Sequence, residues 1–434
     1  MRKAVALFLT IALLLVCIPN AFAARTTIIF WHYPQDEYSD AWWEEWIEEY
    51  NNSQNEVYVE LEWVPMDGWN VKLKGAQAAG TAPDIYGMPL ADAGRNVTNG
   101  TVLAFDEYVD PAIWEDLTDV ARQYTYINGS YWSFPRYLEP SAMLLWRKDL
   151  FEAAGLDPEM PPTTWDELIE TGKKLKTDTC WGLHIPTNEA DIGWTTWGMQ
   201  YGLSGSLALN DDWSKSRMSE LEGYHQLANF FNDVYWANIA PEQAIYGYGS
   251  IDALCENRCA MLMTGSWSLA TVLIDYPEMV DKIGVSHFPT PDGSYDHATA
   301  SMGGYCVLMD KLTEHPQECA DFLVWMFTRD PAVMYDFFER SHFSKFSPWK
   351  SVESMIAQAD TYSINPWLET VMDTVIPYSI PEPIYPWEVT YAFGRAVNRI
   401  LLEGYDAEEA LRIADDEVNK YIENFGLAGQ NLKN

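Results

Sequence analysis

The fold is decided by the stretch GSYWSFPRYLEPSAMLLWRKDLF, which spans residues 129–151. Its first part, 131–134, is aromatic and strand-prone, and 143–146 is a short apolar run followed by charged residues. Two prolines between them fix their own φ and push the preceding residues away from helix, which predicts a kinked connector over 135–140. A strand, a stiff connector and a second strand suit a chain crossing between two lobes. The alternative is an ordinary strand–turn–strand unit within one sheet.

The segments before this stretch alternate between strand and helix patterns. The expected elements are strands at 26–30, 57–63 and 82–86, with helices at 39–50 and 69–79 between them. This alternation predicts an α/β layer with parallel strands. Ligands of such sheets bind at the carboxyl ends of the strands, so the loops at 31–36 and 87–94 are expected to face one cleft.

The rest of the chain continues the mixed pattern. Thr164 and Glu167 form a capping box that predicts a helix start. Further strands are expected at 258–265, 281–288 and 302–309, and further helices at 220–235, 315–327, 387–402 and 406–424. We find no internal repeat and no low-complexity linker, so the two lobes are expected to be interleaved, with several crossings between them.

The N-terminus has the pattern of a secretory signal peptide over residues 1–23. Two basic residues precede an apolar run at 4–16, and Ala21 and Ala23 form an A-x-A cleavage site. Cys17 raises lipid anchoring as an alternative, but the bulky Val16 before it favours cleavage after Ala23. The protein is therefore expected in the periplasm or at the extracellular face, and soluble after cleavage.

The charge and length of the chain exclude some classes of function. The formal net charge of −37 becomes −39 when Arg2 and Lys3 are removed with the leader. Nucleic-acid binding needs a basic surface, so it is not expected. About 410 mature residues exceed what one hydrophobic core organises, which predicts two or more domains.

Neither a cofactor site nor a catalytic motif is evident. The sequence contains no G-x-S-x-G, H-E-x-x-H, P-loop or G-x-G-x-x-G pattern, and the cysteines and histidines lack zinc-site spacing. The pairing of the five cysteines after the leader stays open. A glycosidase-like carboxyl pair stays open as well, because 64 acidic residues offer many candidates.

Aromatic residues beside carboxylates in glycine- or proline-rich loops suggest sugar binding, because aromatic faces stack on pyranose rings and planar polar groups hold the hydroxyls. The chain has 20 Trp and 25 Tyr, most of which are expected in the core. Five loop segments combine the two features: 31–36, which begins with Trp31, and 136–139, 189–197, 265–267 and 385–391.

The segment LLWRKDLFEAAGLDPEMPPTTWDELIETGKKL, with the aromatic strand before it, resembles the family 1 extracellular solute-binding proteins of bacterial ABC importers, relatives of the maltose-binding protein. The resemblance extends over about residues 26–423. It implies a two-lobe periplasmic-binding-protein fold (type II) with interleaved lobes joined by hinge crossovers. The expected N-terminal lobe is 24–136 plus about 298–345, and the C-terminal lobe is 137–297 plus about 346–434.

The resemblance also implies ligand-binding residues. The tryptophan of the well-matched A-M…G-S-W motif, Trp267, is a stacking residue in the family. The others are carboxylates after two strands, a glutamate in the first crossing, aromatics in the penultimate helix and contacts from a variable loop. Together with Trp31 and Arg136 from the aromatic loops, the expected site is Trp267, Asp36, Glu139, Tyr391, Trp31, Asp92, Trp194, Glu189, Arg136 and Trp387.

The expected function is that of a binding protein, not an enzyme. It would hold a sugar or oligosaccharide between the lobes without a cofactor and, as a monomer, deliver it to the membrane subunits of an ABC permease. One alternative is the same fold with a polyamine, a glycerol phosphate, a peptide or another small solute. A phosphorylated ligand needs cleft cations, for which Arg136 is the evident candidate. The other alternative is a secreted glycoside hydrolase or lyase.

Overall fold

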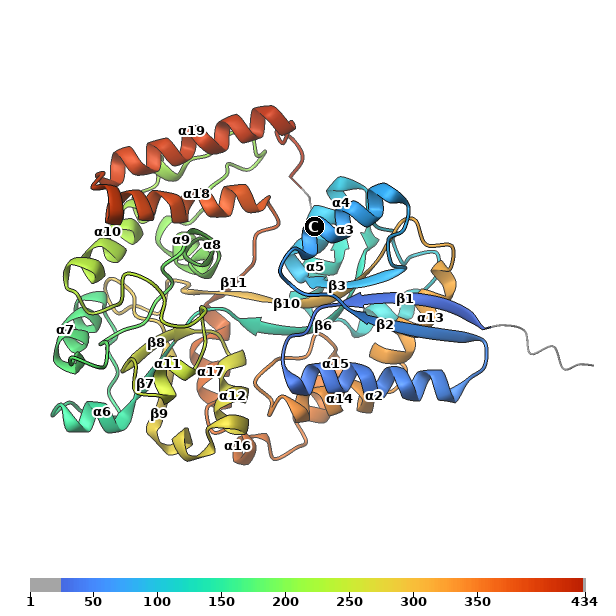
Figure 1. The fold of residues 1–434 in the computed structure, drawn as a ribbon, viewed down its shortest axis with the longest axis horizontal. Coiled ribbons are helices and arrows are strands. Elements are labelled where there is room, and N and C mark those ends of the chain that lie inside the picture. Colours follow the sequence, from blue (N-terminus) through green and yellow to red (C-terminus); the bar gives the residue numbers. More distant parts are fainter. Residues whose placement is uncertain (1–24, 432–434) are drawn as a thin grey trace, which may run out of the picture.

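The computed structural model of the chain describes residues 25–431, which form two lobes connected by strands that run between them (Figure 1). The predicted α/β class with a two-lobe architecture is confirmed. The expected leader, its cleavage site at Ala23 and Cys17 lie outside the described residues. Within residues 25–431, no helix combines the length and the apolar character that a bilayer span requires.

The N-terminal lobe is built on a mixed sheet with the strand order β11–β10–β3–β1–β2, to which β6 adds by pairing with β10. As predicted, β1 pairs in parallel with β2 and β3, whereas β10 runs antiparallel to β3 and β6. The strands are β1 (Thr26–His32), β2 (Val57–Trp63), β3 (Ile85–Pro89), β6 (Ser133–Pro140), β10 (Ala300–Met309) and β11 (Ser379–Pro381), with the small hairpin β4 (Tyr126–Ile127) and β5 (Ser130–Tyr131) beside them.

Helices cover this sheet because each presents an apolar stripe to it. In α2, for example, Trp42, Trp43 and Ile47 are buried at helical spacing while the glutamates between them face water. The helices of the lobe are α2 (Glu37–Ser53), α3 (Trp69–Ala79), α4 (Leu90–Asn99), η1 (Pro111–Asp116), α5 (Asp119–Thr125), α13 (Pro316–Phe327), α14 (Pro331–Arg340) and α15 (Lys350–Ile356).

The C-terminal lobe has a three-stranded antiparallel sheet in the order β8–β7–β9. Its strands are β7 (Met143–Arg147), β8 (Met261–Thr264) and β9 (Ile283–His287). Its helices are α6 (Lys148–Ala153), α7 (Trp165–Leu175), α8 (Glu189–Thr195), α9 (Trp197–Ser204), η2 (Met218–Glu220), α10 (Glu222–Trp236), α11 (Asp252–Cys255), α12 (Trp267–Asp275), η3 (Pro277–Lys282), α16 (Thr361–Ile364), α17 (Leu368–Thr374), η4 (Ile376–Tyr378), α18 (Trp387–Asn398), the π-helix η5 (Arg399–Glu403) and α19 (Ala407–Phe425).

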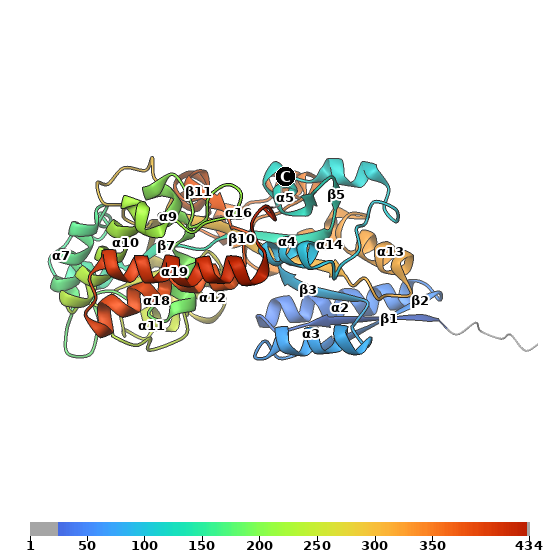
Figure 2. The same ribbon diagram turned by 90° about the horizontal axis from the view of Figure 1, so that it is seen from above.

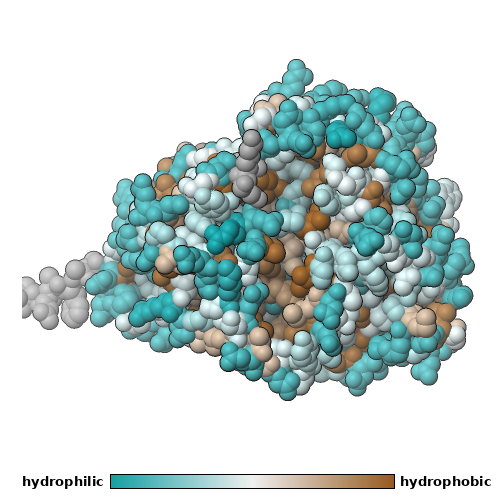
Figure 3. Space-filling model, turned by 180° about the vertical axis from the view of Figure 1, so that it is seen from behind, coloured by the Kyte–Doolittle hydropathy of each residue, from teal (hydrophilic) through white to brown (hydrophobic). Residues whose placement is uncertain are grey.

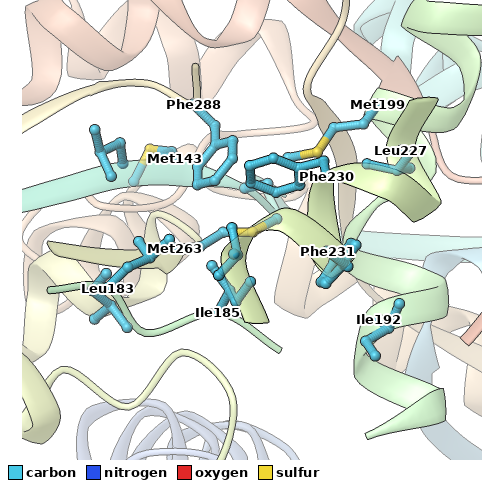
Figure 4. Packing of buried hydrophobic residues seen from close by; sticks show 14 of the residues in the cluster. Met143, Leu183, Ile185, Ile192, Met199, Leu227, Phe230, Phe231, Met263 and Phe288 are labelled. Atoms are coloured by element: carbon cyan, nitrogen blue, oxygen red, sulfur yellow. The ribbon is translucent and has the colours of Figure 1, made fainter. Parts of the chain in front are cut away.

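Each lobe has its own hydrophobic core. In the C-terminal lobe, side chains of β7 and β8 meet those of α10, and Met143, Met263, Phe230 and Phe288 lie together in Figure 4. Each such side chain contributes about 1.5–3 kcal/mol by burial, so this core stabilises the lobe independently of the other. The five described cysteines are free and buried in these cores, which answers the open question of their pairing.

The prediction of a kinked connector at 135–140 is wrong, because β6 is one strand from Ser133 to Pro140. The prolines fit because β6 lies at the edge of the sheet and pairs only with β10 among the strands. Pro135 lies opposite Cys306, where the register shifts between Tyr305 and Cys306, so its missing N–H breaks no regular ladder. The apolar run after it forms β7, as predicted.

The chain crosses between the lobes at several adjacent places. At the first, Ser141 lies between β6 and β7, and its N–H donates to the carbonyl of Ser301 at 2.9 Å, where the second crossing enters β10. Residue 346 exchanges two backbone hydrogen bonds with Leu138 of β6, so the chain is still attached to the N-terminal lobe before it crosses again. Seen from above, the strand β10 lies in the narrow region between the lobes (Figure 2). Seen from behind the view of Figure 1, a groove with apolar residues at its surface runs between the lobes (Figure 3).

The core of the N-terminal lobe extends a few residues past the boundaries that we expected at 136 and 345. It includes Tyr137 and Leu138 of β6, together with Trp349 and Val352. The indole N–H of Trp349 donates to the carbonyl of Pro135 at 3.0 Å, which attaches this segment to β6. We therefore propose that the lobes divide at Ser141 and after α15.

Gly304 in β10 generates a prediction about the stability of the crossing. Its φ is +144°, and a Cβ there would lie 1.9 Å from the carbonyl oxygen of Tyr137. Gly304→Ala should therefore lower the free energy of unfolding by about 2 kcal/mol or more in urea titrations. The control is Gly75→Ala in the exposed part of α3, where a Cβ meets nothing within 4 Å. That change should stabilise by about 0.5–1 kcal/mol, and an equal effect of both variants would contradict the prediction.

Candidate functional site

A hollow lies between the two lobes. It consists of two adjoining cavities of about 150 and 550 Å³, which share Glu139, Trp194, Trp267 and Tyr305 as lining residues. We call this combined space the cleft. The N-terminal lobe contributes β6, β10 and the loop after β1, and the C-terminal lobe contributes α8, α12 and the beginning of α18.

The floor of the cleft on the N-terminal lobe carries a buried lysine among acidic groups. Lys345 Nζ lies 3.3 Å from Asp36 Oδ2 and 4.3 Å from the ring centre of Tyr137. Burial alone would lower the pKa of Lys345, but Tyr137, Glu139 and Asp36 outweigh burial and raise it. Lys345 therefore stays charged, and its charge is compensated within the site.

Glu139 has a free hydrogen-bonding atom at the cleft. Its Oε2 is buried and has no hydrogen-bond partner among the described residues. Burial raises the pKa of Glu139; Lys345 opposes this rise, and Asp36 adds to it. Because an unpaired buried carboxyl oxygen is costly, it is satisfied by a ligand or by water. Glu139 is thus suited to hold a hydroxyl group of a ligand.

The opposite wall, on the C-terminal lobe, is aromatic. Trp194, Tyr248 and Trp267 are half-buried, with ring centres 5.4–6.3 Å apart. Trp267 follows the β8 strand, and its ring lies over Gly265, where a Cβ would be 1.9 Å from the ring. The glycine of the G-S-W motif therefore allows the indole to lie close against the backbone. Such ring faces can stack on an apolar ligand face.

At the upper end of the cleft, α4 and α18 approach each other. The guanidinium of Arg95 lies 4.8 Å from the ring centre of Trp387 and forms an ion pair with Asp92. Its Nε donates to the carbonyl of Tyr385 at 3.0 Å. Arg95 thus holds Trp387 at the cleft through Nη1 and Nε, whereas its Nη2 is buried and has no hydrogen-bond partner among the described residues.

The structure brings five of the ten predicted site residues into the lining of the cleft. Asp36, Glu139, Trp194, Trp267 and Trp387 all line it, although they come from five separate segments of the chain. Asp36 is also the N-cap residue of α2, because its Oδ1 accepts a hydrogen bond from the N–H of Ser39 at 2.8 Å. Their contact with a ligand remains a prediction.

The other five lie outside the lining. Trp31 packs on Trp69 and Lys72 in the N-terminal lobe, and Asp92 is buried against Arg95. The remaining three are placed as follows: Arg136 is buried among the rings of Trp43, Tyr137 and Phe337, Tyr391 stacks behind Trp387, and Glu189 begins α8.

Several lining residues were not predicted from the sequence. Tyr305 follows the glycine pair of β10, and Tyr248 and Lys345 lie in loops without periodic signals. Glu382 stands between Pro381 and Pro383, and the proline-flanked carboxylate was the one local signal that could have marked it. The others are brought to the cleft by tertiary contacts alone.

Comparison with known proteins shows that most of the chain matches one protein family. Residues 45–361 match the family described as bacterial extracellular solute-binding protein. A probable amino-acid ABC transporter periplasmic-binding protein of Sinorhizobium fredii is 29% identical over 120 residues, 28% of this chain and 26% of that protein. The sn-glycerol-3-phosphate-binding periplasmic protein of Agrobacterium fabrum is 43% identical over 63 residues, 14% of each chain. These matches thus span about a quarter or less of the curated relatives.

Solved structures share the fold over most of the chain. A solute-binding protein of Thermotoga lettingae bound with α-D-tagatose is 22% identical, with a TM-score of 0.74 over 91% of this chain and 99% of that one. The maltose/maltodextrin-binding domain of Bdellovibrio bacteriovorus bound to maltotriose is 18% identical, with a TM-score of 0.74 over 92% of this chain and 100% of the other.

Lys345 generates a prediction about the electrostatics of the cleft. Lys345→Met removes the cation that Asp36 and Glu139 share, so the free energy of unfolding at pH 7 should fall by about 1–3 kcal/mol. The loss should shrink as the pH falls and Glu139, whose pKa is raised by burial, becomes protonated, because a neutral carboxyl no longer needs the cation. Urea titrations at pH 7 and pH 4 measure this difference.

The matched control for this variant is Lys350→Met, which removes an exposed lysine five residues along the chain. It should change stability by less than about 0.5 kcal/mol at either pH. A loss in Lys345→Met that is equal at both pH values would assign the effect to packing and contradict the electrostatic account.

Proposed function

Because the chain belongs to the bacterial extracellular solute-binding proteins, we propose that it binds a neutral sugar or oligosaccharide in the cleft and delivers it to an ABC importer. The observation that carries the proposal is that indole faces and carboxyl groups line one cleft from opposite lobes, with Tyr38, Tyr137 and Tyr305 of the N-terminal lobe beside the carboxyl groups. Aromatic faces come from the C-terminal lobe at Trp194 and Trp267, whereas carboxyl groups come from the N-terminal lobe at Asp36 and Glu139. A pyranose presents apolar faces and a rim of hydroxyls, so it can use both walls at once.

The charge distribution favours a neutral ligand. Among the described lining residues, Lys345 is the one cation, and Asp36 and Glu139 compensate it. Arg95 is ion-paired with Asp92. A phosphate dianion would therefore meet a single, already paired cation opposite several carboxyl groups, and a polyamine would meet that same lysine. An uncharged polyhydroxylated ligand avoids both costs.

The ligands of solved structures with this fold support the proposal that the cleft binds a saccharide. Their ligands are named as tagatose, maltotriose and mannotriose, a monosaccharide and two trisaccharides. The combined cleft also has room for more than one sugar ring. Glycerol phosphate stays the second candidate, because two relatives that are 43% and 41% identical over 63 and 61 residues are named for that ligand.

The mechanism follows from the position of the cleft. A ligand that touches both lobes is bound more tightly when the lobes close, so it shifts the population of the protein toward the closed form. Ser141 and the residues paired with it lie where the lobes meet, so the backbone there would bend. We expect the closed monomer to be the form that the membrane subunits recognise, after a leader has been removed near Ala23 outside the cytoplasm.

Intrinsic tryptophan fluorescence tests the proposal directly, because Trp194 and Trp267 line the cleft. The protein is titrated with maltotriose, mannotriose, tagatose, sn-glycerol 3-phosphate and spermidine, and each mixture is analysed for new products. A saturable change with a saccharide and no products supports the proposal. If only sn-glycerol 3-phosphate or only spermidine gives a saturable change, the proposal of a saccharide ligand is overturned. If shorter saccharides appear in the mixtures, the protein is a hydrolase and not a binding protein.

A substitution of Trp267 tests whether this residue takes part in saccharide binding. Trp267→Ala removes a stacking face and should weaken saccharide binding about tenfold or more, which corresponds to about 1.4 kcal/mol or more. Isothermal titration calorimetry measures the affinity. The matched control is Trp236→Ala, since Trp236 is 75% exposed at the end of α10 and lines no part of the cleft. Equal affinity in both variants would remove Trp267 from the site.

A further inference from the structure

Glu382 is held rigidly where the chain leaves the N-terminal sheet for α18. It follows β11 and precedes Pro383, and its backbone N–H donates to the hydroxyl of Tyr124 at 2.6 Å. That hydroxyl donates in turn to the carbonyl of Met302 in β10. The position of the Glu382 backbone is therefore fixed by α5 and β10, and its side chain is directed by this anchorage.

The carboxyl group of Glu382 lies on the floor of the cleft. It rests on Gly303, where a Cβ would lie 2.3 Å from Oε1. It lines the cleft together with Glu139, Trp267 and Trp387. No donor among the described residues makes a hydrogen bond to its oxygens, so the carboxyl is left available to whatever occupies the cleft.

One cation and two carboxyl groups face Glu382, and no described residue among them donates a hydrogen bond to its carboxyl. Arg95 and Asp92 face it from α4, and Glu139 faces it from β6. Arg95 is paired with Asp92 through Nη1 and donates to the carbonyl of Tyr385 through Nε, and its buried Nη2 has no hydrogen-bond partner among the described residues. Burial raises the pKa of Glu382 to about 8; Arg95 opposes the rise, and Glu139 and Asp92 add to it. The group is thus mostly protonated at neutral pH.

Glu382 also borders a second hollow behind the cleft. This cavity of about 410 Å³ lies between α5 and the loop after α9, and residues 381–385 separate it from the cleft. Gln123, Tyr201 and Trp213 line it, and it opens to solvent. Glu382 is thus half-buried between the cleft and a hollow that is open to solvent.

We propose that Glu382 is a specificity-determining residue that donates a hydrogen bond from its carboxylic acid to an oxygen of the bound saccharide. This inference rests on the proposed function. A protonated carboxyl offers a donor that an ionised carboxylate does not offer, so it selects a ligand oxygen that accepts, such as a ring or glycosidic oxygen. The ionised form can only accept, and it brings an uncompensated charge to the ligand.

The proposed hydrogen bond makes the affinity for the saccharide depend on pH, because Glu382 donates only while it is protonated. Below pH 7 the donor is present and affinity is full, whereas affinity falls as the pH rises through about 8 and Glu382 loses its proton. If only the protonated form binds, affinity at pH 9 is about tenfold weaker than at pH 6. The Gln side chain keeps a donor at every pH, so the amide variant does not lose affinity in this way.

The first experiment measures affinity from pH 6 to pH 9.5 by calorimetry, with the member of the set maltotriose, mannotriose and tagatose that saturates the fluorescence change. The wild type should weaken about tenfold by pH 9, and E382Q should lose this dependence. E388Q is the matched control, because Glu388 is exposed in the first turn of α18 and should behave like the wild type. A wild type and E382Q with the same pH dependence would overturn the assignment.

Proton uptake separates this role from a structural one. At pH 9, titrations in two buffers of different ionisation enthalpy should show that the wild type takes up close to one proton per ligand, and E382Q none. Uptake that persists in E382Q would assign the proton to another group and overturn the inference.

A ligand-free measurement completes the test. The ¹³C carboxyl resonances of glutamate-labelled protein should include one that titrates near pH 8 and is missing in E382Q. A Glu382 resonance that titrates near 4.5 overturns the inference whatever the ligand. A wild type that binds none of the three saccharides at pH 6 overturns the proposed function itself, and this inference with it. Saccharide binding with no pH dependence overturns only the role of Glu382.

Discussion

The antiparallel pairing of β6 with β10 is the interaction on which the rest of the structure depends. It joins the first and second crossings between the lobes, so that Ser141 and Ser301, 160 residues apart, lie in hydrogen-bonding contact. The register places Tyr137 opposite Tyr305 and Glu139 opposite Gly303. Because side chains two residues apart on a strand share a face, this register presents tyrosine, carboxyl and glycine positions together to the cleft.

The glycines of β10 show how packing and chemistry are linked at this place. Gly303 has no side chain, and the carboxyl of Glu382 occupies the space that a Cβ would fill. Gly304 brings the backbone of β10 close to that of β6 at Tyr137. The same pair that allows the strands to approach therefore also makes room for an acidic group at the bottom of the cleft. A larger residue at 303 would expel this group before any ligand arrived.

The two lobes bring different chemistry to the cleft. The N-terminal lobe supplies charge, with Lys345 buried among Asp36, Glu139 and Tyr137, and the C-terminal lobe supplies the ring faces of Trp194 and Trp267. Buried charges are costly unless they are compensated, so the lysine and the acids stabilise one another and leave little net charge for a ligand to meet. Closure of the lobes would exclude water and strengthen each polar contact, which makes the orientation of these groups decisive for ligand choice.

The sequence by itself determined the local elements and their class. Local patterns predicted the strands at 26–30 and 57–63, because each strand is encoded by residues close together in the chain, and the alternation of strands with helices predicted their parallel pairing. The family resemblance, carried by the A-M…G-S-W motif, placed Trp267 among the expected ligand residues. What only the tertiary structure decided is which distant residues meet. Pro135 lies within a continuous strand because the register shift in β10 accepts it, and Arg136 is drawn into the core by Trp43 and Phe337. Lys345, Tyr305 and Glu382 reach the cleft through pairings between strands and loops far apart in the chain, and no local pattern encodes such contacts.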